Sequence, residues 1–320
     1  MSADAPRAPA GLRALRPLGR GGMGEVLLAL RREGAFERRY AVKRLRPALR
    51  ADPAARTAFL DEARLAGLLY HPHLVRVFDV GEDADGPFMV MEYVDGLSLG
   101  ALVRRAEARG WDVPLPVGLE LLRDVARGLA AAHEARDVDG RPLELVHRDL
   151  SPENVLVGRD GVARLADFGI ARALGRATET TREILKGKRG YMAPEVLRFE
   201  EPTPRSDLFA FGVVLFETLA GRRLYPPPDG ARRILSEPPP DLLEERPDAP
   251  PALVGLLFAL LAPEPGSRPE SARAVATALE EALARASVDE DELTLARDWL
   301  DALLRRDEDE DATLTGIPLP

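Results

Sequence analysis

The sequence predicts an α+β protein with two lobes, a small β-rich lobe over residues 12–95 that holds one main helix and a larger helical lobe over residues 96–286. Two observations support this prediction. The first part of the chain consists of short apolar runs separated by Gly and polar turns, which is typical of strands. Beyond Gly96, apolar residues recur at helical spacing instead. Residues 1–11 are rich in Pro and Ala and are expected to be loose, whereas residues 287–320 are expected to form an acidic helix and tail.

The small lobe is predicted to contain five strands and one helix. The strands cover Leu12–Arg20, Glu25–Leu30, Tyr40–Leu45, Leu74–Val80 and Pro87–Tyr93. The helix covers Pro53–Tyr70, where apolar residues fall near helical spacing between charged ones. Further helices are predicted in the large lobe over Leu99–Arg109, Val117–Arg136, Ser206–Ala220, Pro251–Ala262 and Pro269–Ala286. Residues 222–251 contain nine prolines and are expected to be largely irregular.

The composition is that of a globular chain and limits the chemistry available to it. Hydrophobic residues make up 45% and charged residues 30% of the 320 residues, so wholesale disorder is not expected. There are no Cys residues, which excludes disulfide bonds, cysteine–zinc sites and a thiol nucleophile. The longest apolar run, from Ala252 to Ala262, is shorter than the roughly 18 residues that a membrane span needs. Because the N-terminus also has no apolar signal segment, we expect a cytoplasmic protein without a membrane span.

The net charge of −9 is concentrated near the C-terminus. Between Asp289 and Asp311, 11 acidic and 3 basic residues give −8, so the remainder of the chain carries about −1. A nearly neutral body does not create the positive field that attracts nucleic acid, so we expect no nucleic-acid partner.

A glycine-rich loop joins the first two predicted strands. The segment Leu18–Val26 contains the pattern G-x-G-x-x-G at Gly19, Gly21 and Gly24. In a dinucleotide-binding fold this pattern precedes a helix, but here a strand follows it, and no alternating βαβ units are visible. A glycine-rich turn between two strands can lay its backbone over phosphates without side-chain clashes. The alternative is an ordinary flexible hairpin.

Lysine is rare in this chain, which draws attention to each one. Only Lys43, Lys186 and Lys188 are lysines among the 44 cationic residues. Lys43 lies in an apolar strand and could pair with phosphates if a carboxylate held it in place. Glu62, on the following helix, is the candidate, and such an ion pair could also act as a switch. The alternative for Glu62 is a solvated carboxylate on a helix surface.

A catalytic cluster is predicted from two short segments, VHRDLSPENVLV over residues 146–157 and DFG over residues 167–169. Asp149, Asn154 and Asp167 supply two carboxylates and an amide, which are oxygen ligands or proton acceptors. Mg²⁺ prefers such hard oxygens and completes its coordination with water and phosphate.

These motifs resemble those of the eukaryotic-type protein kinases, specifically the bacterial (Hanks-type) serine/threonine kinases. The matching pieces are GRGGMGEV, AVK, HRDLSPEN, DFG, YMAPE, DLFAFG and the arginine of PGSRP, in family order across residues 18–268. The resemblance implies the bilobal protein-kinase fold. It also implies transfer of the γ-phosphoryl group of ATP to Ser/Thr hydroxyls of protein substrates, with Mg²⁺ or Mn²⁺ as the metal.

The resemblance further implies a role for each matching residue. The glycine loop covers the phosphates, and Lys43, held by Glu62, contacts the α and β phosphates. Asp149 accepts or orients the proton of the substrate hydroxyl, while Asn154 and Asp167 hold two Mg²⁺ ions. The residues implied around the rest of the nucleotide are Leu18, Val26 and Ala41, Met91 as gatekeeper, the backbone of Glu92 and Val94, and Leu156 as the floor.

Structural supports and regulatory sites are implied in the same way. Glu195 and Arg268 are expected to form a buried ion pair, and Asp207 is expected to hold the backbone around His147 and Arg148. The threonines of the loop after DFG, which are Thr178, Thr180 and Thr181, are candidate autophosphorylation sites. The alternative is that these threonines only fill a polar loop.

The sequence departs from the family pattern at two positions beside the catalytic aspartate. Ser151 stands where these kinases usually have a lysine, and Lys188 stands where they usually have a threonine. We hypothesise that Lys188 supplies the ammonium group that is missing at 151; otherwise it points to solvent and catalysis is slower. The departures also weaken the preference for Ser/Thr over Tyr acceptors. They leave a second reading open, a pseudokinase that binds nucleotide as a scaffold.

The acidic C-terminal region is predicted to form an amphipathic helix from about Asp289 to Arg306. Its apolar stripe consists of Leu293, Ala296, Trp299, Leu300 and Leu303 or Leu304. We expect this stripe to pack on the large lobe; the alternative is that it binds a regulatory partner. The acidic run that follows is typical of a solvated charge block.

Overall fold

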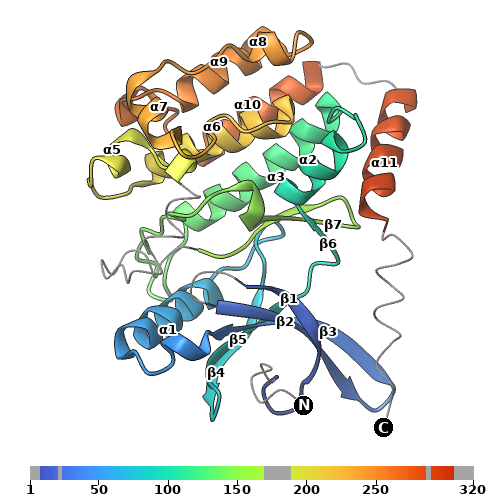
Figure 1. Ribbon diagram of the computed structural model, residues 1–320, viewed down its shortest axis with the longest axis vertical. Helices are drawn as coiled ribbons and strands as arrows, with labels where there is room; N and C mark the ends of the chain where they lie inside the picture. The colour runs from blue at the N-terminus through green and yellow to red at the C-terminus, as the bar shows by residue number, and fades with distance from the viewer. Residues whose placement is uncertain (1–7, 21–23, 169–188, 286–289, 306–320) are drawn as a thin grey trace.

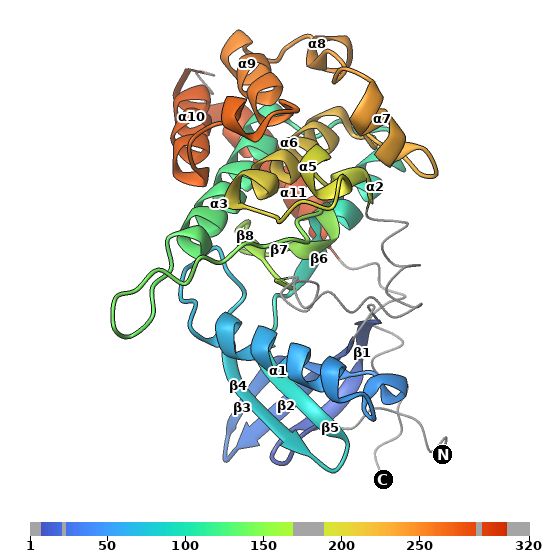
Figure 2. The same cartoon turned by 90° about the vertical axis from the view of Figure 1, so that its left-hand side faces the viewer.

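The computed structural model describes residues 8–20, 24–168, 189–285 and 290–305 (Figure 1). They form a small lobe built on one antiparallel sheet and a large lobe built mainly from helices. Helix α1, Pro53–Gly67, lies across one face of the small-lobe sheet (Figure 2). The arrangement of a sheet-based lobe followed by a helical lobe agrees with the predicted fold.

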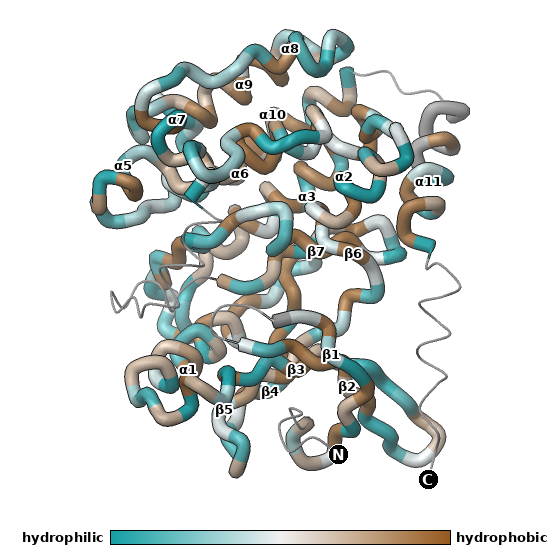
Figure 3. Tube along the Cα trace, viewed as in Figure 1, coloured by the Kyte–Doolittle hydropathy of each residue, from teal (hydrophilic) through white to brown (hydrophobic). Residues whose placement is uncertain are grey.

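The sheet of the small lobe has five antiparallel strands in the order β1-β2-β3-β5-β4. Their bounds are Arg13–Arg20, Gly24–Glu33, Phe36–Leu45, Val77–Asp83 for β4 and Gly86–Glu92 for β5. Apart from the tip at residues 34–36, the outer part of the β2–β3 hairpin, residues 31–39, is hydrophilic (Figure 3). On the outer face of the sheet, Ala8 and Leu12 pack against the buried residues Ala29 and Val42.

Strand β4 starts three residues later than the sequence predicted. The N–H of Val75 donates to the carbonyl of Leu165 at 2.8 Å, and the N–H of Leu165 donates to the carbonyl of His73 at 2.9 Å. The first residues of the predicted strand therefore bond to the large lobe instead of to β5. These two backbone hydrogen bonds connect the segment before β4 in the small lobe to Leu165 in the large lobe.

Helix α1 begins at an N-cap, Asp52, whose carboxylate accepts the N–H of Ala54 at 2.9 Å. The helix buries Phe59 and Ala63 against the inner face of the sheet, in a core that also contains Ala41 and Met91. Glu62 is buried on the same helix, with 7% of the residue exposed. The packing of α1 therefore carries a carboxylate to the inner face of the sheet.

The large lobe is organised around two helices, α3 over Leu115–His133 and α6 over Pro204–Ala220. Nearly every residue of α6 is buried, because it is apolar on all sides and passes through the core. The other predicted helices also form, as α2 Leu99–Glu107, α9 Pro251–Leu260 and α10 Ala272–Arg285. A small sheet, which the sequence did not reveal, joins β6 Gly96–Ser98, β7 Val155–Gly158 and β8 Ala163–Leu165.

The proline-rich segment 222–251 is more ordered than predicted. Two short helices form in it, α7 Gly230–Ser236 and α8 Leu242–Glu245. Helix α7 starts close to the preceding loop because its first residue, Gly230, has no side chain. A Cβ at this position would lie only 2.5 Å from the carbonyl oxygen of Tyr225. The prolines fall between these helices rather than inside them, so the count of prolines alone underestimated the helical content.

The C-terminal helix α11, Glu290–Leu304, packs beside α2 and α3 at the edge of the large lobe (Figure 1). Leu303 and Leu304 are buried in the core of the large lobe, as expected for its apolar stripe. The guanidinium of Arg105 donates to the carbonyl of Leu303 at 2.9 Å, which satisfies the end of the helix. Among the described residues, no helix has the length and apolar character that a membrane crossing requires.

Candidate active site

Lys43 lies at the centre of an ion-pair network between the two lobes. It follows Ala41 by two residues on β3, so its side chain points to the inner face of the sheet. Its Nζ donates to Oε1 of Glu62 at 2.8 Å and to Oδ1 of Asp167 at 2.7 Å. Burial lowers the pKa of the lysine, but Asp167 and Glu62 together outweigh burial and raise that pKa above its ordinary value. The ammonium group therefore stays charged at neutral pH.

The described glycines of the loop differ in what surrounds them. A Cβ at Gly24 would lie 3.2 Å from Cγ of Lys43 and 3.1 Å from the carbonyl oxygen of Arg44. A side chain at this position would collide with the aliphatic part of Lys43, so the glycine allows β2 to lie close to β3 at this point. A Cβ at Gly19 would meet nothing within 4 Å. Gly21 lies outside the described residues.

The catalytic loop is held together by Asn154. Its Nδ2 donates to the carbonyl oxygen of Asp149 at 2.7 Å and to Oδ2 of the same residue at 3.0 Å. The carbonyl of Asn154 accepts the N–H of Ala166 at 2.9 Å, which links this loop to the segment that carries Asp167. Hydrogen bonds therefore join Asp149 to Asn154 and Asp167 to Lys43, and the bond from Ala166 to Asn154 connects the two pairs through the residue before Asp167.

Two residues at the candidate site have left-handed backbone conformations. Arg148 has a φ of 64° and Asp167 a φ of 54°, which are uncommon for residues other than glycine. Such conformations cost free energy and persist where the surrounding structure requires them, often at functional sites. Here Arg148 directly precedes the catalytic candidate Asp149, and Asp167 is itself a candidate metal ligand.

The residues present fit a magnesium ion. The side-chain nitrogen of Asn154 donates to Asp149, so the side-chain oxygen of Asn154 points away from Asp149. Asp167, which follows the Ala166 that bonds to the carbonyl of Asn154, supplies carboxylate oxygens, one of which accepts from Lys43. An amide oxygen and a carboxylate are ligands that Mg²⁺ takes when phosphate and water complete its coordination.

Asp207 supports the catalytic loop from α6, as predicted. The residue is 2% exposed, and its carboxylate accepts the N–H of His147 at 2.7 Å and the N–H of Arg148 at 2.9 Å. It also lies 2.8 Å from Nε2 of His133, a contact that the sequence analysis missed. The ring of His147 stacks against Phe168 with centroids 4.7 Å apart. These contacts join the catalytic loop to the segment of Asp167.

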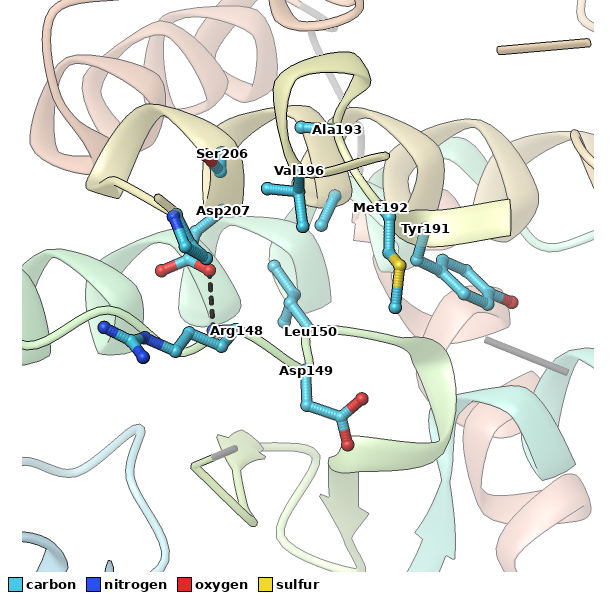
Figure 4. Close-up of a pocket in the computed structure, with 11 residues that line it drawn as sticks. Arg148, Asp149, Leu150, Tyr191, Met192, Ala193, Val196, Ser206 and Asp207 are labelled. Carbon is cyan, nitrogen blue, oxygen red and sulfur yellow. Dashed lines mark hydrogen bonds between the residues drawn. The ribbon is translucent and has the colours of Figure 1, made fainter. Parts of the chain in front are cut away.

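A hollow lies next to Asp149 on the side of the large lobe (Figure 4). It is lined by Arg148, Asp149, Leu150, Tyr191, Met192, Ala193, Val196, Pro202, Ser206, Asp207 and Ala210. In Figure 4 the apolar side chains of Leu150, Met192 and Val196 gather on the side of Asp149 that faces α6, while the Asp149 carboxylate points away from α6. The hollow can hold a small apolar group close to the catalytic carboxylate.

One wall of this hollow is fixed by Tyr191, whose hydroxyl donates to Oε2 of Glu217 at 2.6 Å. Burial raises the pKa of the Tyr191 hydroxyl, and the nearby Glu217 carboxylate raises it further, so the tyrosine stays protonated. The sequence analysis missed this pair. Glu217, which with Asp207 is one of two carboxylates in the largely apolar helix α6, was the available signal, because a buried charge needs a partner.

The predicted ion pair between Glu195 and Arg268 is present and buried. The two guanidinium nitrogens of Arg268 donate to the two carboxylate oxygens of Glu195 at 2.7 and 2.8 Å. The hydroxyl of Ser206 donates to the same carboxylate at 2.7 Å. This arrangement ties helix α5, Pro194–Leu197, to the body of the large lobe.

The residues predicted around the adenine come from five strands, β1, β2, β3, β5 and β7, and from the segment between the lobes. Ala41 and Met91 face each other on β3 and β5 and are buried, and Val26 packs against them. The N–H of Glu92 donates to the carbonyl of Arg76 at 2.8 Å. The remaining three are Leu156 on β7 and Val94, both half-buried, and Leu18 on β1, which is 36% exposed.

Several predicted residues fall where the structure gives no description. Lys188 and the three loop threonines, Thr178, Thr180 and Thr181, lie outside the described residues. Ser151 is described and is 1% exposed. Its hydroxyl is buried without a hydrogen-bond partner among the described residues. The position that usually carries a lysine is therefore closed to solvent in this chain.

Comparisons with known proteins agree with this geometry. The family model for the protein kinase domain matches residues 12–279. The tyrosine-protein kinase MasK of Myxococcus xanthus (strain DK1622) is 39% identical over 273 residues, which cover 83% of this chain and 42% of MasK. The serine/threonine-protein kinase PknK of Mycobacterium tuberculosis (strain ATCC 25618 / H37Rv) is 36% identical over 294 residues, which cover 89% of this chain and 25% of PknK. This chain therefore spans less than half the length of either relative.

Solved structures give the same result. The crystal structure of the Mycobacterium tuberculosis PknI kinase domain superposes with a TM-score of 0.63 at 31% sequence identity. The match covers 88% of this chain and 99% of the PknI domain.

Proposed function

The chain belongs to the protein kinase family, and from this premise we propose that it transfers the γ-phosphoryl group of ATP to hydroxyl groups of proteins. One observation carries the proposal: the ammonium of Lys43 bonds to both Glu62 and Asp167. This ion pair between the lobes is the arrangement that phosphoryl transfer requires, because the lysine must be held where it can meet the phosphates.

The nucleotide would bind between the glycine loop and the residues Ala41, Met91 and Leu156. Lys43 would hold the α and β phosphates, and the narrow approach at Gly24 keeps the stem of this lysine in place. Asn154 and Asp167 would hold Mg²⁺, or Mn²⁺ in its place, which neutralises charge on the transferred phosphoryl group.

Asp149 would accept or orient the proton of the substrate hydroxyl. Asn154 donates to its Oδ2, which fixes the direction of the carboxylate. The apolar hollow beside Asp149 supports a protein substrate, since a side chain next to the phosphorylated residue could enter it. General base catalysis of this kind contributes about 10²–10⁴ to the rate.

The alternative of a nucleotide-binding scaffold is less well supported. A scaffold does not need a catalytic carboxylate that is aimed and held by hydrogen bonds, yet Asp149 is both. The metal ligands and the ion pair of Lys43 are also all present. We therefore propose an active kinase, whose partners are protein substrates. A regulatory partner at the C-terminal helix would contact the face of α11 that carries Leu295, whose exposed fraction is 68%.

The preferred acceptor is proposed to be Ser or Thr, with Tyr as a second candidate. The relative PknK is named a serine/threonine-protein kinase, whereas MasK is named a tyrosine-protein kinase. Ser151 favours the second candidate, because the lysine usual in Ser/Thr kinases is absent and its place is buried. Incubation of the chain with γ-labelled ATP, Mg²⁺ and a mixed protein substrate, followed by acid hydrolysis, separates the two. Labelled phosphoserine or phosphothreonine supports the proposal, and phosphotyrosine alone contradicts it.

We propose that Lys188 supplies the positive charge that position 151 lacks. Replacing Lys188 with Met is then expected to lower kcat by about tenfold to a hundredfold, because one contact to the transferred group is lost. The KM for ATP should change little, since Lys43 and the glycine loop still bind the nucleotide. Lys186→Met, which removes a lysine two residues away, is the matched control. Full activity of the Lys188→Met variant would end the idea.

A further inference from the structure

Arginine and aromatic side chains alternate across the outer face of the small-lobe sheet. The guanidinium of Arg38 lies 5.5 Å from the ring centroid of Tyr40 and 5.0 Å from that of Phe78, and that of Arg31 lies 5.4 Å from Tyr40. The guanidinium of Arg76 lies 5.3 Å from Phe78 and 4.8 Å from Tyr70. We call this set the arginine ladder; it consists of Arg31, Arg38, Arg76, Tyr40, Tyr70 and Phe78.

The strand register places these residues on one face. Arg31 of β2 and Arg38 of β3 are direct cross-strand partners, so their side chains point the same way. Tyr40 follows two residues after Arg38 and shares its face. The rings of Tyr40 and Phe78 meet edge to face at 5.6 Å, which connects β3 to β4. The ladder is therefore a consequence of the register.

The ladder is charged, exposed and short of internal partners. Arg38, Arg76 and Phe78 are exposed, and Tyr70 is 79% exposed. In the parts of the chain that the structure describes, no carboxylate lies within 4.0 Å of the Arg38 or Arg76 guanidinium. Arg31 has one distant pair, with Glu33 at 3.9 Å. Guanidinium groups stacked on rings keep their donors free for bidentate bonds to carboxylates.

The ladder ends next to the connection between the lobes, close to where α11 packs. The N–H of Arg76 lies 3.4 Å from a carboxylate oxygen of Glu92, and Glu92 pairs with Arg164 of β8 at 3.4 Å. The turn between β7 and β8 then reaches α11, because a Cβ at Gly161 would lie 3.6 Å from Cδ2 of Leu300. A short series of contacts therefore leads from the ladder to the C-terminal helix.

An acidic segment follows α11 in the sequence. The helix ends at Leu304, with its C-terminal end toward the small lobe (Figure 1). Five consecutive carboxylates follow after two arginines, from Asp307 to Asp311. Six residues beyond Arg305 can span about 20 Å when extended. The opposite charge of this segment and the short connection to α11 favour it as the occupant of the ladder.

We propose that the segment Asp307–Asp311 binds the arginine ladder of the same chain. The tail would then form a strap from the large lobe to the small lobe, outside the segment that joins them. The tether raises the effective concentration of the carboxylates at the ladder, so modest charge pairs suffice. This binding goes beyond the proposed transfer of phosphate and does not depend on it.

The scarcity of lysine allows a direct test on the full chain. The variants Arg38→Lys and Arg76→Lys keep the positive charge and place an amine in the ladder. A water-soluble carbodiimide joins amines to carboxylates in contact, and only three other lysines compete. The matched control is Arg39→Lys, because Arg39 is exposed on the same strand but points to the opposite face. Mass spectrometry then identifies the joined peptides.

The proposal predicts cross-links from residues 38 and 76 to the segment 307–311, with yields at least about tenfold above the Arg39→Lys control. These cross-links should fall to the control level at about 1 M NaCl, where the screening length is about 3 Å. In a mixture of ¹⁴N- and ¹⁵N-labelled chains, they should join peptides of the same label. Equal yields in the control, or cross-links that join mainly peptides of different label, would overturn the proposal.

Discussion

Replacing Asp149 with Asn is expected to lower the rate of phosphoryl transfer by about 10²–10⁴-fold while ATP binds as it does to the wild-type chain. The amide has the shape of the carboxylate but cannot accept a proton from the substrate hydroxyl. The hydrogen bond from the side-chain amide of Asn154 to the backbone carbonyl of residue 149 does not involve the substituted group, so the loop should keep its conformation. The nucleotide contacts at Lys43 are likewise unaffected.

This prediction is checked with two measurements on each protein, the initial rate of label transfer and the dissociation constant for ATP with Mg²⁺. Asp139→Asn is the matched control, because Asp139 is exposed in the loop between α3 and the catalytic segment. The control should retain the wild-type rate. An Asp149→Asn variant that transfers phosphate at the wild-type rate would show that the carboxylate has no catalytic role.

Replacing Arg268 with Ala is expected to destabilise the fold by about 3–5 kcal/mol. The change leaves the carboxylate of Glu195 buried with only Ser206 as a side-chain donor, because the Arg268 side chain is 0% exposed and the Glu195 side chain 5% exposed. Arg268 also donates to the carbonyls of Ala262 and Pro263, which would lose that donor. Urea unfolding of the variant and the wild-type chain measures the loss.

An exposed pair supplies the control for this experiment. Arg273 and Glu134 also form an ion pair, but their side chains are 69% and 44% exposed. Arg273→Ala should therefore cost no more than about 1 kcal/mol. A second control, Glu195→Ala combined with Arg268→Ala, should cost less than the sum of the two single changes, because no unpaired charge remains. Equal losses for Arg268→Ala and Arg273→Ala would contradict the account of the buried pair.

The same ion pair predicts a dependence of stability on pH. Burial raises the pKa of the Glu195 carboxyl, but the hydrogen bonds from Arg268 and Ser206 outweigh burial and hold that pKa below its ordinary value. A carboxyl with a lowered folded-state pKa contributes stability above the pKa of the unfolded chain and loses it as the pH falls through the folded value. Arg268→Ala should therefore reduce the loss of stability on acidification.

The elements that the sequence predicted best are those whose pattern is local. Helix α1 was anticipated from apolar spacing, and its bounds differ from the predicted ones only at the end. The position of Lys43 on an apolar strand and of Glu62 on the next helix also followed from local patterns. Their pairing was one of two possibilities that the residues left open, the family resemblance implied it, and the structure contains it. The full set of motifs therefore predicted which residues form the candidate active site better than any single residue could.

The elements that were missed depend on contacts between distant parts of the chain. Strand β8 has three residues and forms only because β7 pairs with it, so its sequence carries no periodic signal. The late start of β4 results from the bond between Val75 and Leu165. The arginine ladder depends on the register of β2 with β3 and of β4 with β5. None of these features can be deduced before the pairing of the strands is known.

The central claim is that Lys43, Asp149, Asn154 and Asp167 serve one metal-bound triphosphate. A crystal structure of the chain with Mg²⁺ and a non-hydrolysable ATP analogue tests it most directly. The account predicts Asn154 and Asp167 as Mg²⁺ ligands at about 2.1 Å, Lys43 on the phosphates and Asp149 facing the terminal phosphoryl group. A nucleotide bound elsewhere, or bound between the lobes without contact to these four residues, would contradict the account.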